Sequence, residues 1–381
     1  MKKNISLFFQ HVPPFAGAGS RRAKSIIEGL GKSSDEVNLK LYTTVEKNKL
    51  KEIDKTVVIS GLSEGNKSNY LFRLIKEILI GFKVGFRIIF KYNKPDLLII
   101  SSPSYFGFLV IGFLAKFRKV KYALEIRDIY PEVFYYSGLL KKFKIVYKIL
   151  DFMTINVYKS AAVIVCSNKL IEKNINVKVP NVKTETVFNG FPDNLIDLSK
   201  NKFDEFTICF HGVLGVFQDV NTLKNVITKL KYLNVNVIAI GYGPKENLLK
   251  DIKQDNFKFL GRKTLNETTE IISKCHLGLS LRTKEYISLN CFPVKNWEYL
   301  GAAIPSINTP QNEAALFCSE YEIGQSLESG DVDMIINYIN KYVNDKDFYE
   351  LQSNNCRIIR DKYSRSNTGD LAAKIFLNLI R

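Results

Sequence analysis

The sequence predicts an α/β protein with two doubly wound, Rossmann-like domains that face each other across a cleft. Its 381 residues exceed a single core of ordinary size, and 46% of them are hydrophobic, as in a globular protein. Short apolar runs of strand length alternate with amphipathic segments of helix length, and the alternation stops once and then begins again. This alternation is typical of parallel sheets with helices on both faces, which bind ligands at the carboxyl ends of their strands.

The first predicted domain comprises residues 1–190, and its strands are expected at 5–10, 39–45, 56–60, 96–102, 121–127 and 161–167. A linker rich in Asn, Pro and Asp follows within residues 178–202. The second predicted domain comprises residues 203–365, with strands at 206–212, 236–243, 257–261, 277–281 and 304–309. The amphipathic segment 366–381 is long enough to return to the first domain as a helix.

Cysteine and histidine usage indicates the compartment and the absence of metal motifs. The six cysteines show no CxxC spacing, and the N-terminus has no apolar core followed by a small-residue cleavage site. We therefore expect a reducing, cytoplasmic compartment. The three histidines lie far apart and in no zinc-binding pattern, so we expect neither a bound metal nor another cofactor.

The net charge of +17 lies entirely in the first half of the chain. Residues 1–190 carry 32 Lys and Arg against 15 Asp and Glu, whereas residues 191–381 carry 23 of each. This asymmetry predicts an anionic partner for the first domain, either nucleic acid or an anionic membrane surface.

Two basic and apolar segments, 70–94 and 139–150, favour the membrane. The first places five cations among Leu, Ile and Phe: Arg73, Lys76, Lys83, Arg87 and Lys91. The longest apolar run, 105–115, has 11 residues and is too short to span a bilayer. We expect peripheral binding at the inner face of the cell membrane. The alternative is that segment 70–94 packs on a sheet with its lysines in water.

A glycine turn follows the first strand. Gly17 and Gly19 precede a helix that begins near Ser20, and the free amides there can hold a phosphate or the oxygens of a sugar. The spacing is not GxGxxG and no acidic residue ends the second strand, so a dinucleotide is weakly supported. The alternative is a tight turn without a ligand.

The stretch EIRDIYPE brings charges to the end of the strand at 121–127. Arg127, Asp128 and Glu132 stand where a parallel sheet places its chemistry, and buried charges without partners are costly. We expect a functional role for them. The alternative is an Arg127–Glu132 ion pair that orders the loop.

The stretch NCFPVKNWEYLGAAIP predicts a nucleotide-diphosphate site. Pro293 suits the start of a helix, whose free amides attract an anion to which Lys295 adds a full charge. Glu298 follows three residues on, nearly on the same face, where a carboxylate suits the neighbouring hydroxyls of a ribose. The alternative is a solvent-facing Lys–Glu pair.

These stretches, together with PPFAGAGSRR, HGVLG, IGYGP and FLG, resemble glycosyltransferase family 4 over nearly the whole chain. The resemblance implies the GT-B fold, with an acceptor-binding first domain and a donor-binding second domain. It also implies a retaining transferase of the type that builds capsule, O-antigen or exopolysaccharide. Glu298 matches the ribose-binding glutamate of the family. Asn290 stands where the family has a glutamate that touches the donor sugar, so the identity of the sugar stays open.

The resemblance extends to further site residues. Val216 stands where the family often has an arginine after the glycine, so we expect Arg282 and Lys295 to bind the diphosphate. The loop that meets the acceptor or the donor sugar is expected to include Gly17, Gly19, Ser20, Arg127 and Glu132. The expected donor-binding set is Gly215, Gln218, Gly243, Arg262, Arg282, Asn290, Lys295 and Glu298.

The mechanism implied by the resemblance is metal-independent transfer of a hexosyl group from a nucleotide sugar, with a UDP-sugar favoured. Asp128 is expected near the acceptor hydroxyl, as a base or an orienting group. The expected acceptor is a polyprenyl-diphosphate-linked sugar or an oligosaccharide. The alternatives are a nucleotide-sugar epimerase, a phosphorylase, or a non-enzymatic basic module. Nucleic acid is not an expected partner, because the basic stretches are interleaved with apolar residues and match no nucleic-acid-binding motif.

Overall fold

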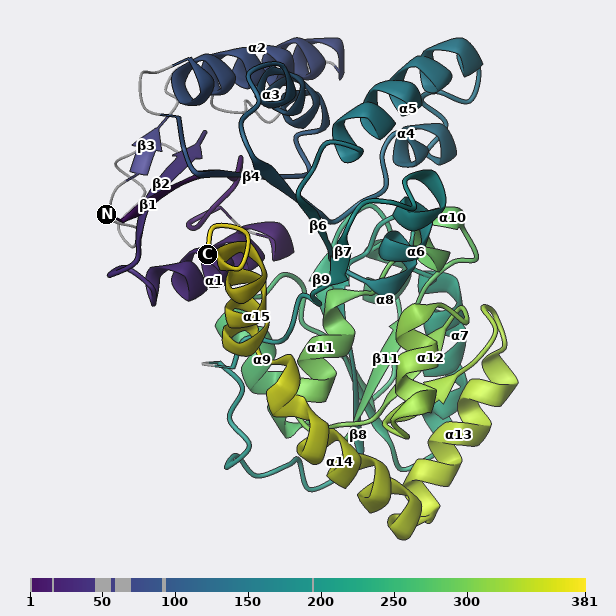
Figure 1. Cartoon of the computed structure of the whole chain (residues 1–381). Helices are drawn as coiled ribbons and strands as arrows, with labels where there is room; N and C mark the ends of the chain where they lie inside the picture. The colour runs from purple at the N-terminus through teal and green to yellow at the C-terminus, as the bar shows by residue number, and fades with distance from the viewer. Residues whose placement is uncertain (1, 16, 45–55, 59–69, 91–93, 194) are drawn as a thin grey trace. The chain divides into compact units, whose positions relative to one another are not determined.

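The computed structural model describes the chain except residues 1, 16, 45–55, 59–69, 91–93 and 194 (Figure 1). It divides into two compact units, Met1–Phe188 with Ser366–Arg381, and Asn189–Arg365. Lys91 and the last two residues of the strand expected at 56–60 lie outside the described residues.

The first unit is built on a seven-stranded parallel sheet in the order β3-β2-β1-β4-β5-β6-β7. The strands are β1 (Lys3–Phe8), β2 (Val37–Thr43), β3 (Thr56–Val58), β4 (Leu97–Ser101), β5 (Tyr122–Ile126), β6 (Val163–Cys166) and β7 (Thr184–Thr186). Every residue of β4, β5 and β6 is buried, as expected for central strands that helices cover on both faces.

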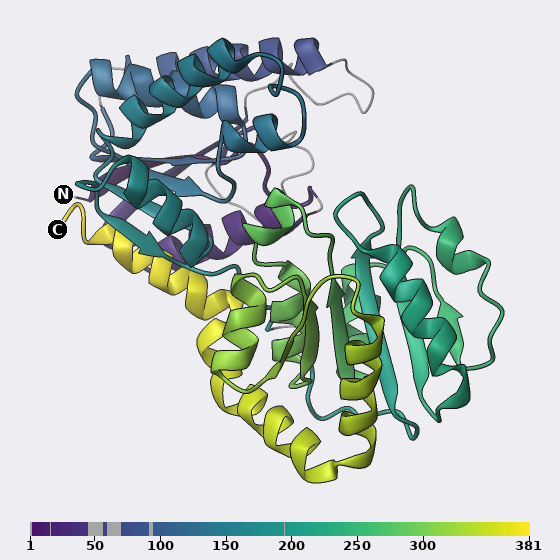
Figure 2. The same cartoon turned by 90° about the vertical axis from the view of Figure 1, so that its right-hand side faces the viewer.

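Helices cover both faces of this sheet (Figures 1 and 2). On one face lie α2 (Tyr70–Ile89), α3 (Tyr105–Phe117) and α5 (Lys144–Tyr158), which share one apolar core. The short helix α4 (Glu132–Tyr136) and α6 (Lys169–Lys178) also contribute to that core. The opposite core is formed by α1 (Ala18–Gly31) and α15 (Arg365–Leu377).

Helices α1 and α15 approach closely because each has a glycine at the crossing. A Cβ on Gly29 would lie 2.6 Å from the Gly369 carbonyl oxygen, and a Cβ on Gly369 would lie 2.3 Å from the Ser25 carbonyl oxygen. Only hydrogen fits at these two positions, so the C-terminal helix can bury Ala372 and Phe376 in the core of the first unit.

The second unit has a six-stranded parallel sheet in the order β10-β9-β8-β11-β12-β13 (Figure 1). Its strands are β8 (Thr207–Val213), β9 (Asn236–Tyr242), β10 (Phe257–Phe259), β11 (Leu277–Leu281), β12 (Ser306–Thr309) and β13 (Gly324–Ser326). Its helices are α7 (Val220–Lys229), α8 (Asn247–Lys250), α9 (Leu265–Lys274), α10 (Tyr286–Leu289), α11 (Val294–Gly301), α12 (Glu313–Glu320), α13 (Val332–Asn344) and α14 (Lys346–Arg360).

The strand order reverses once in each sheet, between β1 and β4 and between β8 and β11. Both units therefore have the doubly wound Rossmann-like topology, and the predicted fold class is confirmed. At a reversal the loops leave the sheet in opposite directions, which opens a crevice at the carboxyl ends of the strands. Among the helices of the described residues, none is long and apolar enough to cross a membrane.

Candidate functional site

Two glycine turns meet at the carboxyl edge of the second sheet. The turn after β8 includes Gly215, and the turn after β9 includes Gly243, whose φ of 138° favours glycine. A Cβ on Gly243 would lie 2.9 Å from the carbonyl oxygen of Leu214, so a side chain there would push the turns apart. Lys245 braces the first turn, since its Nζ donates to the carbonyl oxygen of Gln218 at 3.1 Å.

Lys295 lies beside the first of these turns. It is the second residue of α11, its side chain is buried, and its Nζ donates to Oε1 of Gln218 at 2.9 Å. The Nζ lies 4.0 Å from the centroid of the Phe210 ring. Gly212 lies beside this side chain, and its φ of 131° favours glycine, whereas a Cβ there would be at an ordinary contact distance of 3.6 Å from the Nζ.

Burial and the nearby charge of Arg282 lower the pKa of Lys295 to about 7, against an opposing effect of Glu298. The lowered pKa means that the surroundings only partly compensate the charge of the ammonium group. An anion that entered beside Lys295 would stabilise the charged form, so this position is suited to a phosphate.

Arg282 stands at the end of β11 and approaches the same turn. Its backbone N–H donates to the Thr309 carbonyl oxygen at 3.1 Å, and its backbone forms an antiparallel bridge with Gln218. Its Nε donates to Oγ of Ser288 at 3.4 Å. Gln218 therefore contacts Lys295 through its side chain and Arg282 through its backbone, and the charge of Arg282 acts on Lys295.

Glu298 lies one helical turn beyond Lys295. Its Oε2 is 3.4 Å from Nε2 of His211, at the end of β8, and its Oε1 is 4.0 Å from Nη2 of Arg365. Lys295 and Glu298 are only 6% and 4% exposed, so the alternative of a solvent-facing pair is wrong. A carboxylate beside these two side chains can accept hydrogen bonds from ligand hydroxyl groups.

The other two predicted donor residues have local contacts. Asn290 ends α10, and its Nδ2 donates to the carbonyl oxygen of Tyr286 at 2.9 Å. Arg262 is exposed, and its guanidinium carbon lies 4.6 Å from the centroid of the Tyr242 ring. Gln218 thus contacts both Arg282 and Lys295. The contacts described for Asn290 and Arg262 are with other residues, Tyr286 and Tyr242.

Four residues of this site did not emerge from the sequence as site residues: His211, Gly212, Lys245 and Arg365. His211 directly precedes the glycine turn in FHG, a position that could have drawn attention to it. Lys245 belongs to IGYGPK, and its contact with the turn after β8 depends on the pairing of β8 with β9.

The carboxyl edge of the first sheet has its own glycine turn. Gly17 has a φ of 133° and directly precedes α1. A Cβ on Gly19 would lie 1.4 Å from Nη1 of Arg127, so the guanidinium group occupies the space that a side chain would fill. Arg127 is held there by a hydrogen bond from its Nε to the Ser102 carbonyl oxygen at 2.7 Å. Ser20 is buried, and its Oγ makes no hydrogen bond within the described part of the chain.

A buried ion pair lies beneath this turn. Nε of Arg22 is 2.6 Å from Oε1 of Glu125, and both side chains are buried. Oγ of Ser101 donates to Oε2 of Glu125 at 2.5 Å, and Nη1 of Arg22 donates to the Val187 carbonyl oxygen at 2.6 Å. This pair joins α1 to the end of β5 and was not predicted.

The three carboxylates around EIRDIYPE differ in their surroundings. Glu125 lies 3.6 Å from Nε of Arg127, and Glu132 forms an ion pair with Lys178. The alternative of an Arg127–Glu132 ion pair is therefore wrong, because Arg127 lies near Glu125 and Glu132 pairs with Lys178. Asp128 is the second residue after β5 and is exposed, yet desolvation raises the pKa of its carboxyl group, against the opposing charge of Arg127. It is the carboxylate of the three that an acceptor could reach.

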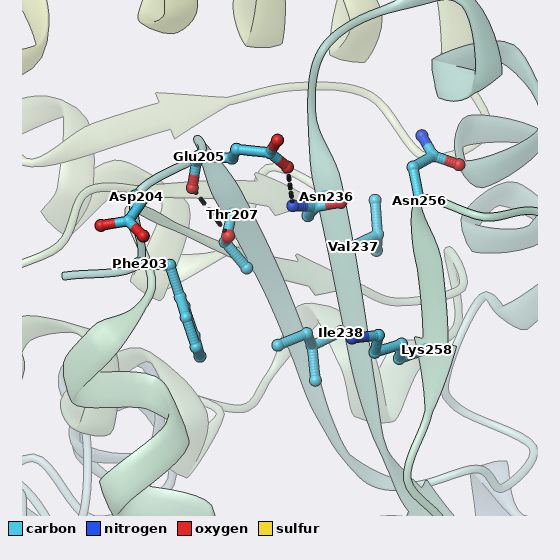
Figure 3. A pocket seen from close by; sticks show the side chains of 9 residues that line it. All are labelled: Phe203, Asp204, Glu205, Thr207, Asn236, Val237, Ile238, Asn256 and Lys258. Atoms are coloured by element: carbon cyan, nitrogen blue, oxygen red, sulfur yellow. Dashed lines mark hydrogen bonds between the residues drawn. The ribbon is translucent and has the colours of Figure 1, made fainter.

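A hollow of about 280 Å³ lies at the opposite edge of the second sheet (Figure 3). It is lined by residues at the amino ends of β8 and β9, including Thr207 and Asn236. Glu205 Oε2 accepts a hydrogen bond from Asn236 Nδ2 at 2.5 Å, so these polar groups are already paired (Figure 3). The hollow is small for a ligand pocket and lies at the wrong edge for a Rossmann-like site.

Within the part of the chain that the structure describes, no group of three or more His, Cys, Asp or Glu is placed to hold a metal ion.

The two units in one chain give the GT-B fold, which is shared by several solved glycosyltransferases. Sucrose-phosphate synthase from Thermosynechococcus elongatus superposes with a TM-score of 0.74 at 13% identity, with 99% of each chain covered. HepE from Anabaena in complex with UDP-glucose gives a TM-score of 0.68 at 14% identity, covering 98% of this chain and 99% of HepE. WaaG, a glycosyltransferase involved in lipopolysaccharide biosynthesis, gives 0.67 at 12% identity, with 98% and 99% covered.

A protein from Listeria monocytogenes described as a UDP-N-acetylglucosamine 2-epimerase also matches, with a TM-score of 0.64 at 10% identity, covering 100% of this chain and 96% of that chain. No family model and no curated protein matches this sequence. At these identities the structural matches show a shared fold alone.

Proposed function

We propose that this protein is a retaining, metal-independent glycosyltransferase. It moves a hexosyl group from a nucleotide-diphosphate sugar, with a UDP-sugar favoured, to a lipid-linked or glycan acceptor in surface-polysaccharide biosynthesis. The observation that carries the proposal is the cluster of Arg282, Lys295 and Glu298 around one glycine turn at the reversal of the second sheet. The similarity to HepE, which was solved with UDP-glucose, supports this choice of donor.

In the proposed complex, Lys295 and Arg282 bind the diphosphate and Glu298 binds the ribose. The diphosphate supplies the negative charge that the surroundings of Lys295 lack, because burial and Arg282 both hold the pKa of that lysine down. The carboxylate of Glu298 would repel a phosphate at the same point. It therefore suits neutral hydroxyl groups, such as the two neighbouring ones of a ribose.

The same cations assist the chemical step. When the bond from the anomeric carbon to the diphosphate breaks, negative charge develops on the leaving oxygen. We expect Lys295 and Arg282 to stabilise that charge, and the burial of Lys295 strengthens its electrostatic effect. Retention of configuration requires the acceptor hydroxyl to attack on the face from which the diphosphate departs. Asp128 is the proposed base or orienting group for that hydroxyl.

The proposed acceptor is a sugar linked to a polyprenyl diphosphate, and the proposed location is the inner face of the cell membrane. The entire net charge of the protein lies in residues 1–190, where Lys83 and Arg87 are exposed on α2. A surface with an excess of cations attracts both anionic lipids and the diphosphate of such an acceptor. The similarity to WaaG, a glycosyltransferase involved in lipopolysaccharide biosynthesis, supports a role in surface-polysaccharide biosynthesis.

The test is donor affinity after substitution of Glu298. Titration calorimetry with UDP-glucose and UDP should show that Glu298→Ala weakens binding of both by about 10- to 100-fold, because two hydrogen bonds from the ribose to the side chain are lost. Glu320→Ala, an exposed position at the end of α12, is the matched control and should bind as the parent does. Unchanged affinity in Glu298→Ala would remove the assignment of the ribose site.

The second candidate is a nucleotide-sugar epimerase, which the similarity to the Listeria protein favours. An epimerase needs no acceptor, so NMR of the protein incubated with a nucleotide sugar alone separates the two. A transferase should leave the sugar's stereochemistry unchanged over hours. Steady formation of an epimer, lost in Glu298→Ala, would replace the proposed function.

A further inference from the structure

A cavity of about 650 Å³ lies in the first unit, whereas the proposed donor site belongs to the second. Its wall is mainly aromatic and aliphatic and comes from α3, α4, α5 and the loop before α5. Its side chains include Tyr105, Phe106, Phe134, Leu140 and Leu150. This volume is ordinary for a ligand pocket, and an apolar lining with few polar groups is typical of sites that bind an apolar molecule.

The lining of the cavity continues onto the outside of the protein. Leu139, Phe143 and Val146 line the cavity and are also 43%, 60% and 43% exposed. A group can therefore pass from the surface beside α5 into the cavity along an uninterrupted apolar path.

The surface around this opening is apolar over two helices. Helix α2 buries Ile80, Val84 and Ile88 in the core, yet a second apolar stripe along it faces outward with helical spacing. Helix α5 lies on the same face of the sheet (Figures 1 and 2). It also exposes apolar side chains. The exposed positions are Phe72, Ile75, Leu79, Phe82 and Phe86 on α2, and Ile145, Ile149 and Phe152 on α5.

Cations are interleaved with these side chains. Lys83 and Arg87 are exposed on α2, and Lys144 and Lys148 are exposed on α5. A helix with apolar and basic side chains on its outer face suits the boundary between water and anionic lipid. The charge therefore favours a membrane over another protein as the cover of this surface, and it places the opening of the cavity at the lipid layer.

The inner end of the cavity is polar. Gln10, His11, Glu77 and Ser104 line it, and Ser104 is 2% exposed. Oγ of Ser104 makes no hydrogen bond to any described residue and is available to a ligand. Ser104 follows β4 and Gln10 follows β1, so this end lies at the carboxyl edge of the sheet, where Asp128 follows β5.

We infer that this cavity binds the isoprenoid chain of the lipid-linked acceptor. The chain enters from the membrane past Phe143, and the cavity holds its segment next to the head group, with the polar end of the lipid toward Ser104. The choice of an isoprenoid rests on the proposed function, whereas the apolar cavity and its opening do not. Such a site would position the acceptor sugar by holding its lipid, and it would make a long-chain acceptor a better substrate than the free glycan.

Two substitutions on neighbouring residues of α5 separate the cavity from the surface around it. Val146→Trp adds a large ring at a position that lines the cavity, whereas Ile145→Trp adds the same ring at a position that is 76% exposed and outside the lining. Both positions are exposed enough to tolerate substitution, and thermal melting of the variants checks folding. Val146→Phe is a milder variant that tests the same point.

The probe is tritiated farnesyl phosphate below its micellar concentration, measured by equilibrium dialysis with the full chain and no donor. The parent should bind it saturably with one site, Val146→Trp should weaken binding at least tenfold, and Ile145→Trp should bind within twofold of the parent. Neither inorganic phosphate nor palmitate should compete, which separates the isoprenoid from a head group alone and from an ordinary acyl chain.

Three results would overturn the inference: no saturable binding by the parent, equal binding by Val146→Trp, or equal losses in both variants. Self-association that Val146→Trp abolishes would show that a second copy of the chain fills the opening instead. Because no donor is present, failure here is distinct from failure of the donor test with Glu298→Ala. If both tests succeed, Val146→Trp should raise KM for a long-chain acceptor and leave KM for a soluble glycan acceptor unchanged.

Discussion

Each of the two sheets has a buried cation near its carboxyl edge, and the two cations differ in whether a carboxylate pairs with them. In the first unit, Arg22 contacts Glu125 at 2.6 Å and donates to backbone carbonyls, so its charge is neutralised within the protein. In the second unit, Lys295 donates to the neutral amide of Gln218 and has a second cation, Arg282, nearby. Two sheets with the same strand order thus use buried charge differently. One charge holds the structure together, and we propose that the other binds a ligand.

A neighbouring lysine sharpens this comparison. Lys202 is also largely buried in the second unit, and burial lowers its pKa to about 8. Its Nζ donates to the carbonyl oxygens of Ser273 at 3.0 Å and Cys275 at 2.8 Å. Lys202 thus donates to two backbone oxygens, whereas Lys295 donates to one side-chain amide, and this difference makes Lys202 a control for Lys295.

The largest expected effect is on the reaction itself. Asp128→Asn should lower the rate of sugar transfer by about 100- to 10,000-fold, because a neutral amide cannot accept the proton of the acceptor hydroxyl. Donor affinity by calorimetry should stay at the parent value. Asp96→Asn, at the amino end of β4 in the same sheet, is the control with unchanged activity. A fully active Asp128→Asn would move the catalytic role to another residue.

The next effect is on stability. Glu125→Gln leaves the charge of Arg22 buried without its partner and should lower the free energy of unfolding by about 3–5 kcal/mol, measured in urea. Glu185→Gln, which removes an exposed pair with Lys183, should cost less than about 1 kcal/mol. Equal costs for the two variants would mean that the buried pair does not join α1 to β5 as the geometry indicates.

Membrane binding is expected to depend on the outer face of α2. Replacing Lys76, Lys83 and Arg87 together by Gln should weaken pelleting with anionic vesicles by roughly 3 kcal/mol, or about 100-fold, at about 1 kcal/mol for each cation. The effect should shrink as salt is raised.

The control for this experiment removes three cations from the second unit. Lys250, Lys253 and Lys258 are exposed, and their replacement by Gln lowers the net charge by the same amount. This variant should pellet as the parent does. If both triple variants lose binding equally, total charge rather than α2 decides the association.

Lys295→Met is expected to change stability by a smaller amount than Glu125→Gln, and to raise it rather than lower it. The folded protein holds the pKa of Lys295 at about 7, well below the value in the unfolded chain. Between these two values the unfolded state binds more protons, so this group makes stability rise with pH above about 7. Replacement by Met should raise the free energy of unfolding at pH 7 by roughly 1–3 kcal/mol, and it should remove that rise.

The affinity of Lys295→Met for UDP-glucose should fall although its stability rises. Lys295→Met should weaken UDP-glucose binding, whereas Lys202→Met should leave that binding unchanged. A Lys295→Met variant that is less stable and binds normally would show that this lysine is structural, as Lys202 is.

Local sequence patterns predict most of the strands and helices. They do not predict contacts between residues that are far apart in the sequence. The alternation of apolar runs predicts the central strands correctly, but β7 and β13 are three residues long and read TET and GQS, which no apolar period reveals. The helix that carries Lys295 and Glu298 is predicted from Pro293 and its local periodicity. The contacts of Glu298 with His211 and of Arg22 with Glu125 depend instead on sheet register and helix packing.

The pH dependence of donor binding tests the central claim most directly. UDP-glucose has no group that titrates near neutrality, so calorimetry in buffers of different ionisation enthalpy reports protons taken up by the protein. If the diphosphate stabilises the charged form of Lys295, binding at pH 8 should take up close to one proton, and binding at pH 6 almost none. Affinity should fall as pH rises above about 7. Lys295→Met should abolish the uptake. Binding at pH 8 without proton uptake, or with the same uptake in Lys295→Met, would contradict the account.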